Sequence, residues 1–489
     1  MAIVILVVYA AALLILFAFG LHALFMVVVY LRLHPDDPIA GDSGSALPTV
    51  TVQLPIYNEL HVVERLLDAV CRLDYPRGLL EIQLLDDSTD ETRSLLEDLA
   101  RSRRAEGHDI AHIHRADRSG YKAGALQAGL DVAKGEMIAI FDADFMPEPD
   151  FLRRTVPFLV EDAGIGMVQA RWEHINAGDS LLTRVQAMAL DAHFAMEQQV
   201  RNRAAFFMNF NGTAGVWRRS CITDAGNWQS DTLTEDLDLS YRAQLRGWRF
   251  LYLNDVSVPA ELPSEIGGFK SQQFRWTKGA IETARKHLRT IWLSHQPLRV
   301  KLQATSHLTS NMIFPFILLV AVLNIPMLLV KKGYPELDLY FNLLSIGLLT
   351  SLFSTAFHLL AQRDLRGDWR RRMLVYPLFM AGTMGLAVNN TRAVVEALIG
   401  HRSEFKRTPK YNALGESGTW KRSRYRERRL TPETVIELGL ALYFVLAIAL
   451  ALYFVELSVI PFQIMFLTGF GMSAFLSIRS VMVGEVEEV

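Results

Sequence analysis

The sequence MIAIFDADF, residues 137–145, is the strongest indication of how this chain folds. Five apolar residues lead directly into Asp142 and Asp144, a pattern that predicts a short buried strand ending in two carboxylates. Open α/β sheets bind their ligands beyond the carboxyl ends of the strands. A D-x-D pair at such an end can hold Mg²⁺ or Mn²⁺, which prefer oxygen ligands and commonly bridge a bound diphosphate. A solvated turn is the alternative interpretation, since D-x-D alone is common.

The alternation of short apolar runs with helical patterns extends over residues 48–300. Such alternation is typical of a mostly parallel sheet with crossover helices. We therefore expect a soluble α/β domain here. The predicted strands are residues 49–54, 80–85, 137–141 and 165–169, and the predicted helices include residues 60–71 and 90–104.

The segment LLDDSTD, residues 84–90, has the same form of a strand followed by acids. Asp86 lies nearest the predicted strand and is the better ligand candidate. Asp87 and Asp90 could equally cap the helix that follows, because Asp and Ser favour the N-cap position.

Two more segments supply candidate contacts for a ligand. QLPIYNE, residues 53–59, also follows a strand, and its Tyr57 could lie against a base or a sugar. In DRSGYKAG, residues 117–124, Lys122 stands beside two glycines at a helix start, where a cation can attract phosphate. A surface lysine is the default interpretation of Lys122 on its own.

The segment TEDLDLSYRAQLRG, residues 234–247, predicts a helix that begins after Thr234 and ends at its final glycine. Asp236 then lies in the first turn, where the helix dipole favours an ionised carboxylate, whereas burial in a pocket would raise its pKa. An ionised aspartate at the mouth of a pocket is a workable general base. A simple capping acid is the alternative, and it would explain Glu235 equally well.

The segment QQFRW, residues 272–276, completes the polar set. On a helix, Gln272, Arg275 and Trp276 share one face. Arginine can neutralise a leaving diphosphate and tryptophan can stack on a sugar ring. A Trp and Arg anchor at a bilayer interface is the alternative interpretation.

The remaining sequence predicts a membrane protein. Residues 2–31 are almost wholly apolar, long enough to span a bilayer at roughly 20 residues per crossing, and they lack the basic start and small-residue cleavage site of a signal peptide. We expect one transmembrane helix at 1–32, a soluble domain at 33–300 and a membrane domain at 301–489. The predicted spans of the membrane domain lie near residues 305–330, 338–360, 433–455 and 458–480.

Charge determines the interpretation of residues 372–398. The flanking segments 363–372 and 402–429 are both rich in arginine, and arginine-rich loops prefer the cytoplasm. If residues 372–398 crossed the membrane, one of these segments would lie outside. We therefore predict an interfacial or re-entrant helix at 372–398, with the soluble domain and both basic segments in the cytosol.

The composition of the chain argues against several other classes of protein. The chain has 489 residues, of which 51% are hydrophobic, and a net charge of −2. Its two cysteines, Cys71 and Cys221, cannot form a disulfide framework or a cysteine-based zinc site. We expect no nucleic-acid partner.

Taken in order, these motifs resemble those of the family 2 processive glycosyltransferases, the group of cellulose, chitin and hyaluronan synthases. The family pattern of D, D-x-D, T/E-E-D and Q-x-x-R-W is matched by Asp86, by Asp142 with Asp144, by residues 234–236 and by residues 272–276. In sequence, the segments QLPIYNE, FDADFMPEPDFL, NGTAGVWR and FKSQQFRW are most similar to cellulose-synthase-like A proteins, the mannan and glucomannan synthases. The resemblance covers residues 48–300 well and the membrane part more loosely.

The resemblance implies a GT-A fold, a mixed α/β sheet for nucleotide sugars, embedded in a transmembrane helical bundle. It implies an inverting hexosyltransferase that uses a UDP-glucose or GDP-mannose type of donor and extends a β-glycan across the membrane. The implied roles are a general base for Asp236 with Glu235 beside it, a Mg²⁺ or Mn²⁺ site for Asp142 and Asp144, and donor contacts for Pro55, Tyr57, Glu59, Asp86, Lys122 and Asp142. Gln272, Arg275 and Trp276 would line the acceptor and leaving-group end.

A gating loop is also implied within residues 399–432. FKRTPK, residues 405–410, resembles the FxVTxK loop of bacterial cellulose synthase, which closes over the donor, although Arg407 replaces the usual valine. Phe405, Thr408 and Lys410 would carry that role. We expect an integral protein of the cell (inner) membrane with a cytosolic catalytic domain, and the sequence identifies no export partner in the periplasm or cell wall.

Two alternative functions remain, and they belong to different classes of protein. A non-processive glycolipid synthase of the ceramide glucosyltransferase type carries a similar motif set, but the FDADF and NGTAGVWR segments and the FxxTxK loop favour a polymer synthase. A non-catalytic transporter or scaffold would tolerate loss of Asp236.

Overall fold

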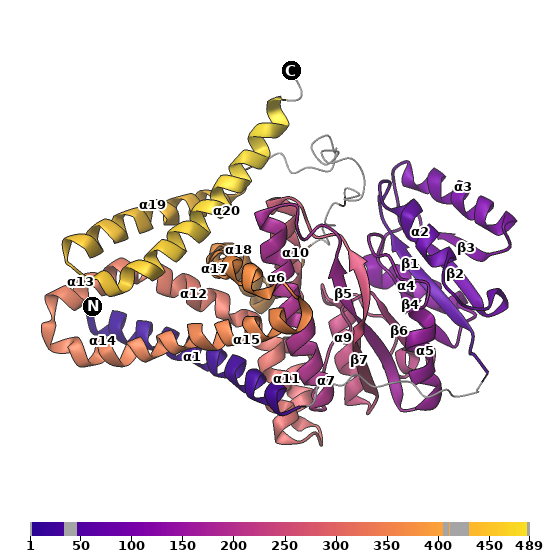
Figure 1. The fold of residues 1–489 in the computed structure, drawn as a ribbon, viewed down its shortest axis with the longest axis horizontal. Helices are drawn as coiled ribbons and strands as arrows, with labels where there is room; N and C mark the ends of the chain where they lie inside the picture. Colours follow the sequence, from indigo (N-terminus) through magenta and orange to yellow (C-terminus); the bar gives the residue numbers. More distant parts are fainter. Residues whose placement is uncertain (1, 34–45, 404–409, 411–429, 487–489) are drawn as a thin grey trace.

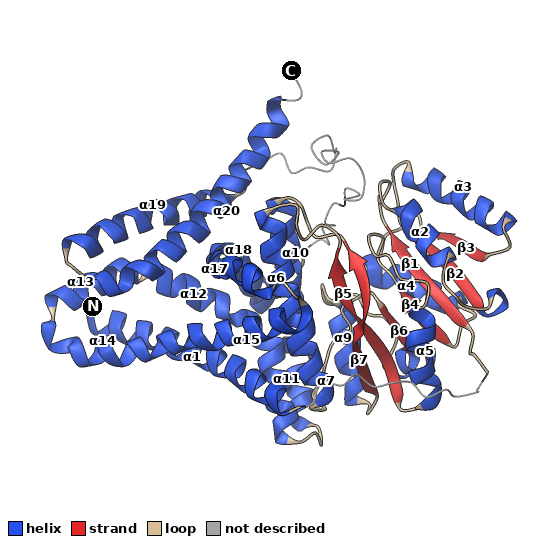
Figure 2. Cartoon of the chain, viewed as in Figure 1, coloured by secondary structure: helices blue, strands red, loops and turns tan. Residues whose placement is uncertain are grey.

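The structure is a computed structural model that describes residues 2–33, 46–403, 410 and 430–486. Figure 1 shows two parts, an α/β domain on one side and a bundle of long helices on the other. Figure 2 shows that the strands are confined to the first part and that the second is wholly helical. The two parts agree with the predicted fold class of an α/β domain joined to a helical bundle, whereas the predicted domain bounds stay a prediction.

The α/β domain is built on one seven-stranded sheet with the strand order β3-β2-β1-β4-β6-β5-β7. Strand β6 runs antiparallel to both of its neighbours, and the other neighbouring pairs are parallel. The sheet is thus mixed, as expected for a GT-A fold. The strands are β1 (Val50–Ile56), β2 (Leu80–Asp86), β3 (Asp109–His114), β4 (Met137–Ile140), β5 (Ile165–His174), β6 (Gly215–Arg218) and β7 (Arg249–Ala260).

Helices cover both faces of the sheet. One apolar core packs α2 (Val63–Cys71), α3 (Thr92–Ala105) and α5 (Phe151–Glu161) against the first face. A second core packs α4 (Tyr121–Val132), α8 (Arg219–Asp224) and α9 (Glu235–Leu245) against the other. Because both faces are covered, the strands are nearly continuous hydrophobic runs, as in residues 137–140.

The helical part contains five helices or helix pairs in the described ranges that are long and apolar enough to cross a membrane. Their number agrees with the predicted spans, although the second begins at Leu298 rather than near residue 305. They are α1 (Ala2–Arg32), α11 with α12 (Leu298–Val322), α14 with α15 (Asp338–Leu365), α19 (Pro432–Tyr453) and Leu457–Met482, most of which belongs to α20 (Ile460–Val486).

Helix α10 (Ile266–Leu293) lies between the two parts, as Figure 1 shows. Two ion pairs with buried lysines fix it to the bundle: Lys270 Nζ lies 2.7 Å from Glu437 of α19, and Lys278 Nζ lies 3.0 Å from Glu396. Glu396 belongs to α18 (Ala387–Ile399), which packs along α10. The bundle therefore holds the helix that carries the QQFRW segment.

The segment predicted as one interfacial helix at 372–398 is two helices, α17 (Tyr376–Gly385) and α18. Neither belongs to the candidate spans among the described residues. A Cβ atom added to Gly385 would lie 2.4 Å from the carbonyl oxygen of Gly469 in α20, so the two backbones touch next to the break. Whether this pair lies at the membrane interface stays a prediction.

Candidate active site

The predicted site residues gather around one cleft beyond the carboxyl ends of β1, β2 and β4. The cleft holds about 1300 Å³, counted out to its open mouth. Nearly all of the predicted site residues that the structure describes line it: Pro55, Tyr57, Glu59, Lys122, Asp142, Asp144, Glu235, Asp236, Gln272, Arg275, Trp276 and Lys410. Phe405 and Thr408 lie outside the described residues.

Asp86 is the exception, because it does not line the cleft. Its side chain is fully buried, and its Oδ2 atom lies 3.0 Å from His112 Nε2 and 3.1 Å from His114 Nδ1. Burial alone would raise the pKa of Asp86, but the hydrogen bonds from His112, the Ser88 N–H and His114 outweigh it and lower that pKa. The adjacent Asp87 lines the cleft instead.

At one end of the cleft, an aromatic side chain faces a cation. The guanidinium of Arg118 lies 3.4 Å from the centre of the Tyr57 ring. The turn that carries Tyr57 has Asn58 in the left-handed region at φ 55°, which Asn tolerates better than most residues. Asn58 is tied to the β2 loop, since its N–H donates to Ser88 Oγ over 3.0 Å. This end is suited to a flat, polar ring such as a nucleobase.

The D-x-D carboxylates each contact a lysine. Lys122 Nζ lies 2.5 Å from Asp142 Oδ1, and Lys410 Nζ lies 2.7 Å from Asp144 Oδ2. Burial lowers the pKa of Lys122, but Asp142 and Glu235 outweigh it, so its pKa is raised and the ammonium stays charged. This part of the cleft therefore concentrates carboxylate oxygens that need cationic partners.

The D-x-D pair fits a divalent cation that is shared with a substrate. Within the described residues, no group of three or more His, Cys, Asp or Glu side chains forms a complete metal cage. Mg²⁺ is commonly held by one or two carboxylates together with substrate phosphates. Asp142 and Asp144 would supply the protein ligands, and a diphosphate would supply others.

Glu235 and Asp236 begin helix α9 as predicted, in the interior of the cleft. Burial raises the pKa of Asp236 to about 7, the charge of Glu235 adds to the shift, and Lys122 opposes it. Burial also raises the pKa of Glu235. Thr234 occupies the N-cap position but makes no side-chain capping bond. The N–H of Leu237 donates to Asp236 Oδ1 over 2.8 Å.

Gly212 shapes the wall next to Asp236. Its φ is +82°, and a Cβ atom there would lie 2.9 Å from Asp236 Oδ2 and 3.4 Å from Lys122 Nζ. A side chain at this position would therefore be strained and would press on the carboxylate. Gly212, the first glycine of NGTAGVWR, therefore leaves room for a ligand beside Asp236 Oδ2.

The QQFRW residues line the cleft from α10. Burial lowers the pKa of Arg275 to about 10, while Glu235, Asp142 and Asp236 oppose the shift, so the guanidinium stays charged. The ring of Trp276 lies 6.4 Å from that of Trp172, centre to centre. These side chains form a cationic and aromatic wall opposite the acids.

Several lining residues were not predicted from the sequence. Trp172 and His174 extend β5 beyond its expected end, and Arg118 stands four residues before the predicted Lys122 in the chain. The DRSGYKAG segment contains Arg118, so the helix-start signal that identified Lys122 could have identified it. For Trp172 and His174 the only signal was their alternation along a strand.

This mixed sheet, with an acidic cleft beyond its strand ends, has the GT-A arrangement. Residues 48–279 match the family described as glycosyltransferase like family 2. Residues 48–279 therefore carry a glycosyltransferase like family 2 domain, in agreement with the family 2 motifs.

Relatives with curated names agree with this class. The chain is 46% identical over 289 residues to glucomannan 4-beta-mannosyltransferase 1 of Oryza sativa, covering 55% of this chain and 56% of that protein. It is 48% identical over 255 residues to glucomannan 4-beta-mannosyltransferase 2 of Arabidopsis thaliana, covering 51% and 47%. The chain thus spans about half the length of the curated relatives it matches.

A solved structure shares the fold. The mannosyltransferase PcManGT of Pyrobaculum calidifontis, in complex with GDP-mannose and Mn²⁺, aligns with a TM-score of 0.58 at 19% sequence identity. The alignment covers 81% of this chain and all of the archaeal one. At this identity the likeness establishes the common fold.

Proposed function

We propose that this protein is a membrane-embedded inverting hexosyltransferase that moves mannose from GDP-mannose to a growing β-glycan. The observation that carries the proposal is the placement of Asp236, the D-x-D pair and Arg275 around one cleft. The names of the curated relatives and of the archaeal structure favour GDP-mannose over UDP-glucose. Processive growth and passage of the polymer through the bundle belong to the same proposal, as does a cytosolic catalytic domain at the cell membrane.

In this mechanism the acceptor hydroxyl gives its proton to Asp236. Its Oδ1 accepts the Leu237 N–H, which leaves Oδ2, beside Gly212, for the hydroxyl. The hydroxyl oxygen bonds to the anomeric carbon as the bond from that carbon to the diphosphate oxygen breaks, which inverts the configuration. Arg275 and Lys122 stabilise the charge that develops on the departing nucleoside diphosphate. A divalent cation on Asp142 and Asp144 would add Lewis-acid stabilisation of the same leaving group.

A transfer assay that identifies the sugar donor and the product tests the proposed function. The purified full chain in lipid nanodiscs would receive radiolabelled GDP-mannose or UDP-glucose with Mn²⁺ or Mg²⁺, and the product would be sized and digested with β-mannanase and cellulase. We expect label from GDP-mannose in a long polymer that β-mannanase degrades. Label confined to a short, solvent-extractable lipid would favour the glycolipid synthase, and absence of transfer from both donors would refute the proposal.

The acidity of Asp236 predicts the pH dependence of transfer. Only the carboxylate can accept the proton, and burial raises the pKa of Asp236 to about 7. As pH falls below that value the base becomes protonated, so kcat/KM should fall about tenfold per pH unit and level off above it. A pH profile of kcat/KM for the acceptor measures this, and an inflection near the ordinary aspartate value would contradict it.

A further inference from the structure

The wall of the cleft next to Asp236 is a strained loop, residues 211–214. Gly212 and Ala214 both have left-handed backbones, with φ of +82° and +56°, a conformation that alanine rarely adopts. Such strain persists only where the surroundings impose it, and it is common at functional sites. The fully buried side chain of Gln169 helps to impose it, because Oε1 accepts the first N–H of the loop over 2.9 Å and Nε2 donates to two of its carbonyl oxygens over 3.1 Å.

This loop contacts the three functional parts of the site. The carbonyl oxygen of Gly212 accepts a hydrogen bond from Lys122 Nζ over 2.9 Å, and Thr213 Oγ1 accepts the Asp142 N–H over 2.9 Å. The backbone of Gly212 also faces the carboxylate of Asp236, since a Cβ atom there would lie 2.9 Å from Oδ2. The loop therefore sets the spacing between the base and the residues that would bind the diphosphate.

Two side chains of one helix hold Asn211, which lines the cleft at the start of the loop. Gln198 Nε2 donates to Asn211 Oδ1 over 2.5 Å, and Asn211 Nδ2 lies 2.9 Å from His193 Nε2. His193 and Gln198 begin and end a π-helical segment, η2 (His193–Gln198). Residues five apart lie about 140° apart around an α-helix, whereas the i→i+5 bonding of a π-turn brings them to one side. The wider turn therefore lets both side chains reach Asn211.

A carboxylate fixes the orientation of His193. The amide nitrogen of Asn211 can only donate, so His193 Nε2 accepts and the proton of the imidazole is on Nδ1. That Nδ1 atom lies 3.1 Å from Glu197 Oε2, and Arg201 Nη2 lies 3.0 Å from the same oxygen. The imidazole is thus held at both of its nitrogens.

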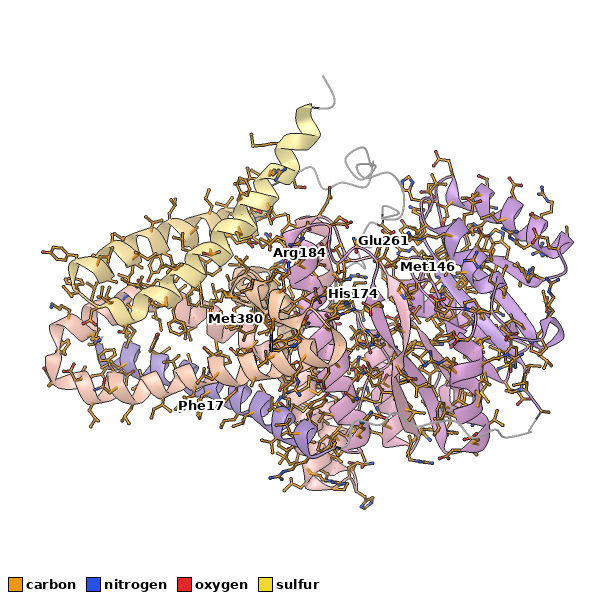
Figure 3. All side chains as sticks on the ribbon, viewed as in Figure 1. Phe17, Met146, His174, Arg184, Glu261 and Met380 are labelled. Carbon is orange, nitrogen blue, oxygen red and sulfur yellow. The ribbon has the colours of Figure 1, made fainter. Side chains whose placement is uncertain are left out.

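Another face of η2 belongs to the contact with the membrane bundle. Met196 packs in an apolar core with residues of α1 and α15 (Leu349–Leu365). Helix α6 (Leu181–Ala192) continues directly into η2 and packs against α15 and α17, and Figure 3 shows its Arg184 where the sheet domain meets the bundle. The segment η2 therefore lies between the strained loop and the bundle.

We propose that Asn211 is a positioning residue of the transfer reaction. Held by His193 and Gln198 across the π-turn, it fixes the strained loop, and the loop fixes the distance from the base to the groups that bind the diphosphate. In-line attack needs both at once, because the acceptor hydroxyl and the leaving diphosphate lie on opposite sides of the anomeric carbon. This inference rests on the proposed function, because it concerns the geometry of the same reaction.

A double-mutant cycle tests the inference. The variants are Asn211→Ala, His193→Phe, which keeps a ring but no nitrogen, and the two combined. The full chain in nanodiscs would be assayed for single-turnover transfer from radiolabelled GDP-mannose, and its affinity for GDP would be measured by titration. We expect Asn211→Ala to lower the transfer rate about 10²-fold, the effect of roughly 1 Å of misplacement. Affinity for GDP should change less than about threefold, because the Tyr57 end of the cleft is untouched.

His193→Phe should lower the transfer rate at least about tenfold by itself but add little in the Asn211→Ala background, because His193 acts through Asn211. Asn209→Ala is the matched control, at a buried asparagine of the same segment that is outside the described lining of the cleft, and should transfer within about twofold of wild type. Thermal unfolding reports whether each variant folds. If His193→Phe does not fold, Gln198→Met removes the other bond to Asn211 and takes its place in the cycle.

Failure of this inference can be told apart from failure of the proposed function. Wild-type protein that transfers no sugar would overturn both, whereas wild-type transfer to a lipid would overturn only the polymer product. Unchanged transfer in His193→Phe, or additive losses in the double variant, would overturn the inference alone. A fall in GDP affinity that parallels the fall in transfer rate would show a general structural role and would overturn it as well.

Discussion

Replacing Asp236 by asparagine is expected to lower kcat by about 10³-fold, within the range that a positioned general base contributes. The variant keeps the shape of the side chain, and its amide oxygen can still accept the Leu237 N–H. It cannot take a proton from the acceptor hydroxyl. Loss of one buried acid next to Glu235 also relieves repulsion, so the folded protein should be at least as stable as wild type.

The measurement is single-turnover transfer from radiolabelled donor, together with donor affinity by titration. Donor affinity should stay within a few-fold of wild type, because Asp236 faces the acceptor. The matched control is Asp238→Asn, on the same helix but outside the cleft. Asp238 is fully buried and contacts His287 at 2.6 Å and Lys286 at 2.8 Å, so this variant should lose thermal stability while its folded fraction still transfers sugar. Transfer above a tenth of wild type in Asp236→Asn would exclude Asp236 as the base.

The acidic strand end at β4 was predictable from sequence because the signal is local. Residues 137–140 are wholly apolar and form a strand with both faces covered, and Asp142 and Asp144 follow within four residues. The register with β1 then places them at the carboxyl edge without further information. The helix starting at Glu235 and the shared face of QQFRW were predictable for the same reason.

The choice between Asp86 and Asp87 was not predictable, because it depends on the partner strand. Successive residues of a strand point to opposite faces, so only one of the two can face the cleft. The register of β2 with β3 pairs Asp86 with His114, and the two histidines of β3 hold that carboxylate away from the cleft. Nothing within residues 84–90 encodes the position of His114.

The full length of strand β5 was not predictable either, because its last residues depend on a distant partner strand. The apolar run predicts a strand that ends at Gln169, but the strand continues to His174. The continuation pairs with β7 after an irregularity between Ala170 and Arg171. That pairing joins residues about 85 positions apart, as in Trp172 with Val258. The polar segment after Gln169 therefore becomes a cleft wall only through a non-local contact.

Removal of divalent metal is expected to abolish transfer as completely as loss of the base. Without a cation, Asp142 and Asp144 would repel the diphosphate of the donor, and Lys122, Lys410 and Arg275 would offset that charge in part. Metal stabilisation of a leaving group contributes several kcal/mol, so chelation should reduce kcat by about 10³-fold or more. Excess Mn²⁺ or Mg²⁺ should restore full turnover to the wild-type protein.

Asp144→Asn should reproduce the chelated state, but added metal should not rescue it. Asp144 is 4% exposed and its Oδ2 atom also accepts the Glu261 N–H over 3.2 Å, a bond that an asparagine oxygen can keep. The loss should therefore appear as weaker metal binding, measured by the Mn²⁺ concentration for half-maximal transfer and by Mn²⁺ electron paramagnetic resonance without donor. Asp150→Asn, at an exposed acid six residues further along the chain, is the control and should keep the wild-type metal dependence. Full transfer in the presence of a chelator would show instead that Lys122, Lys410 and Arg275 stabilise the leaving group without a metal.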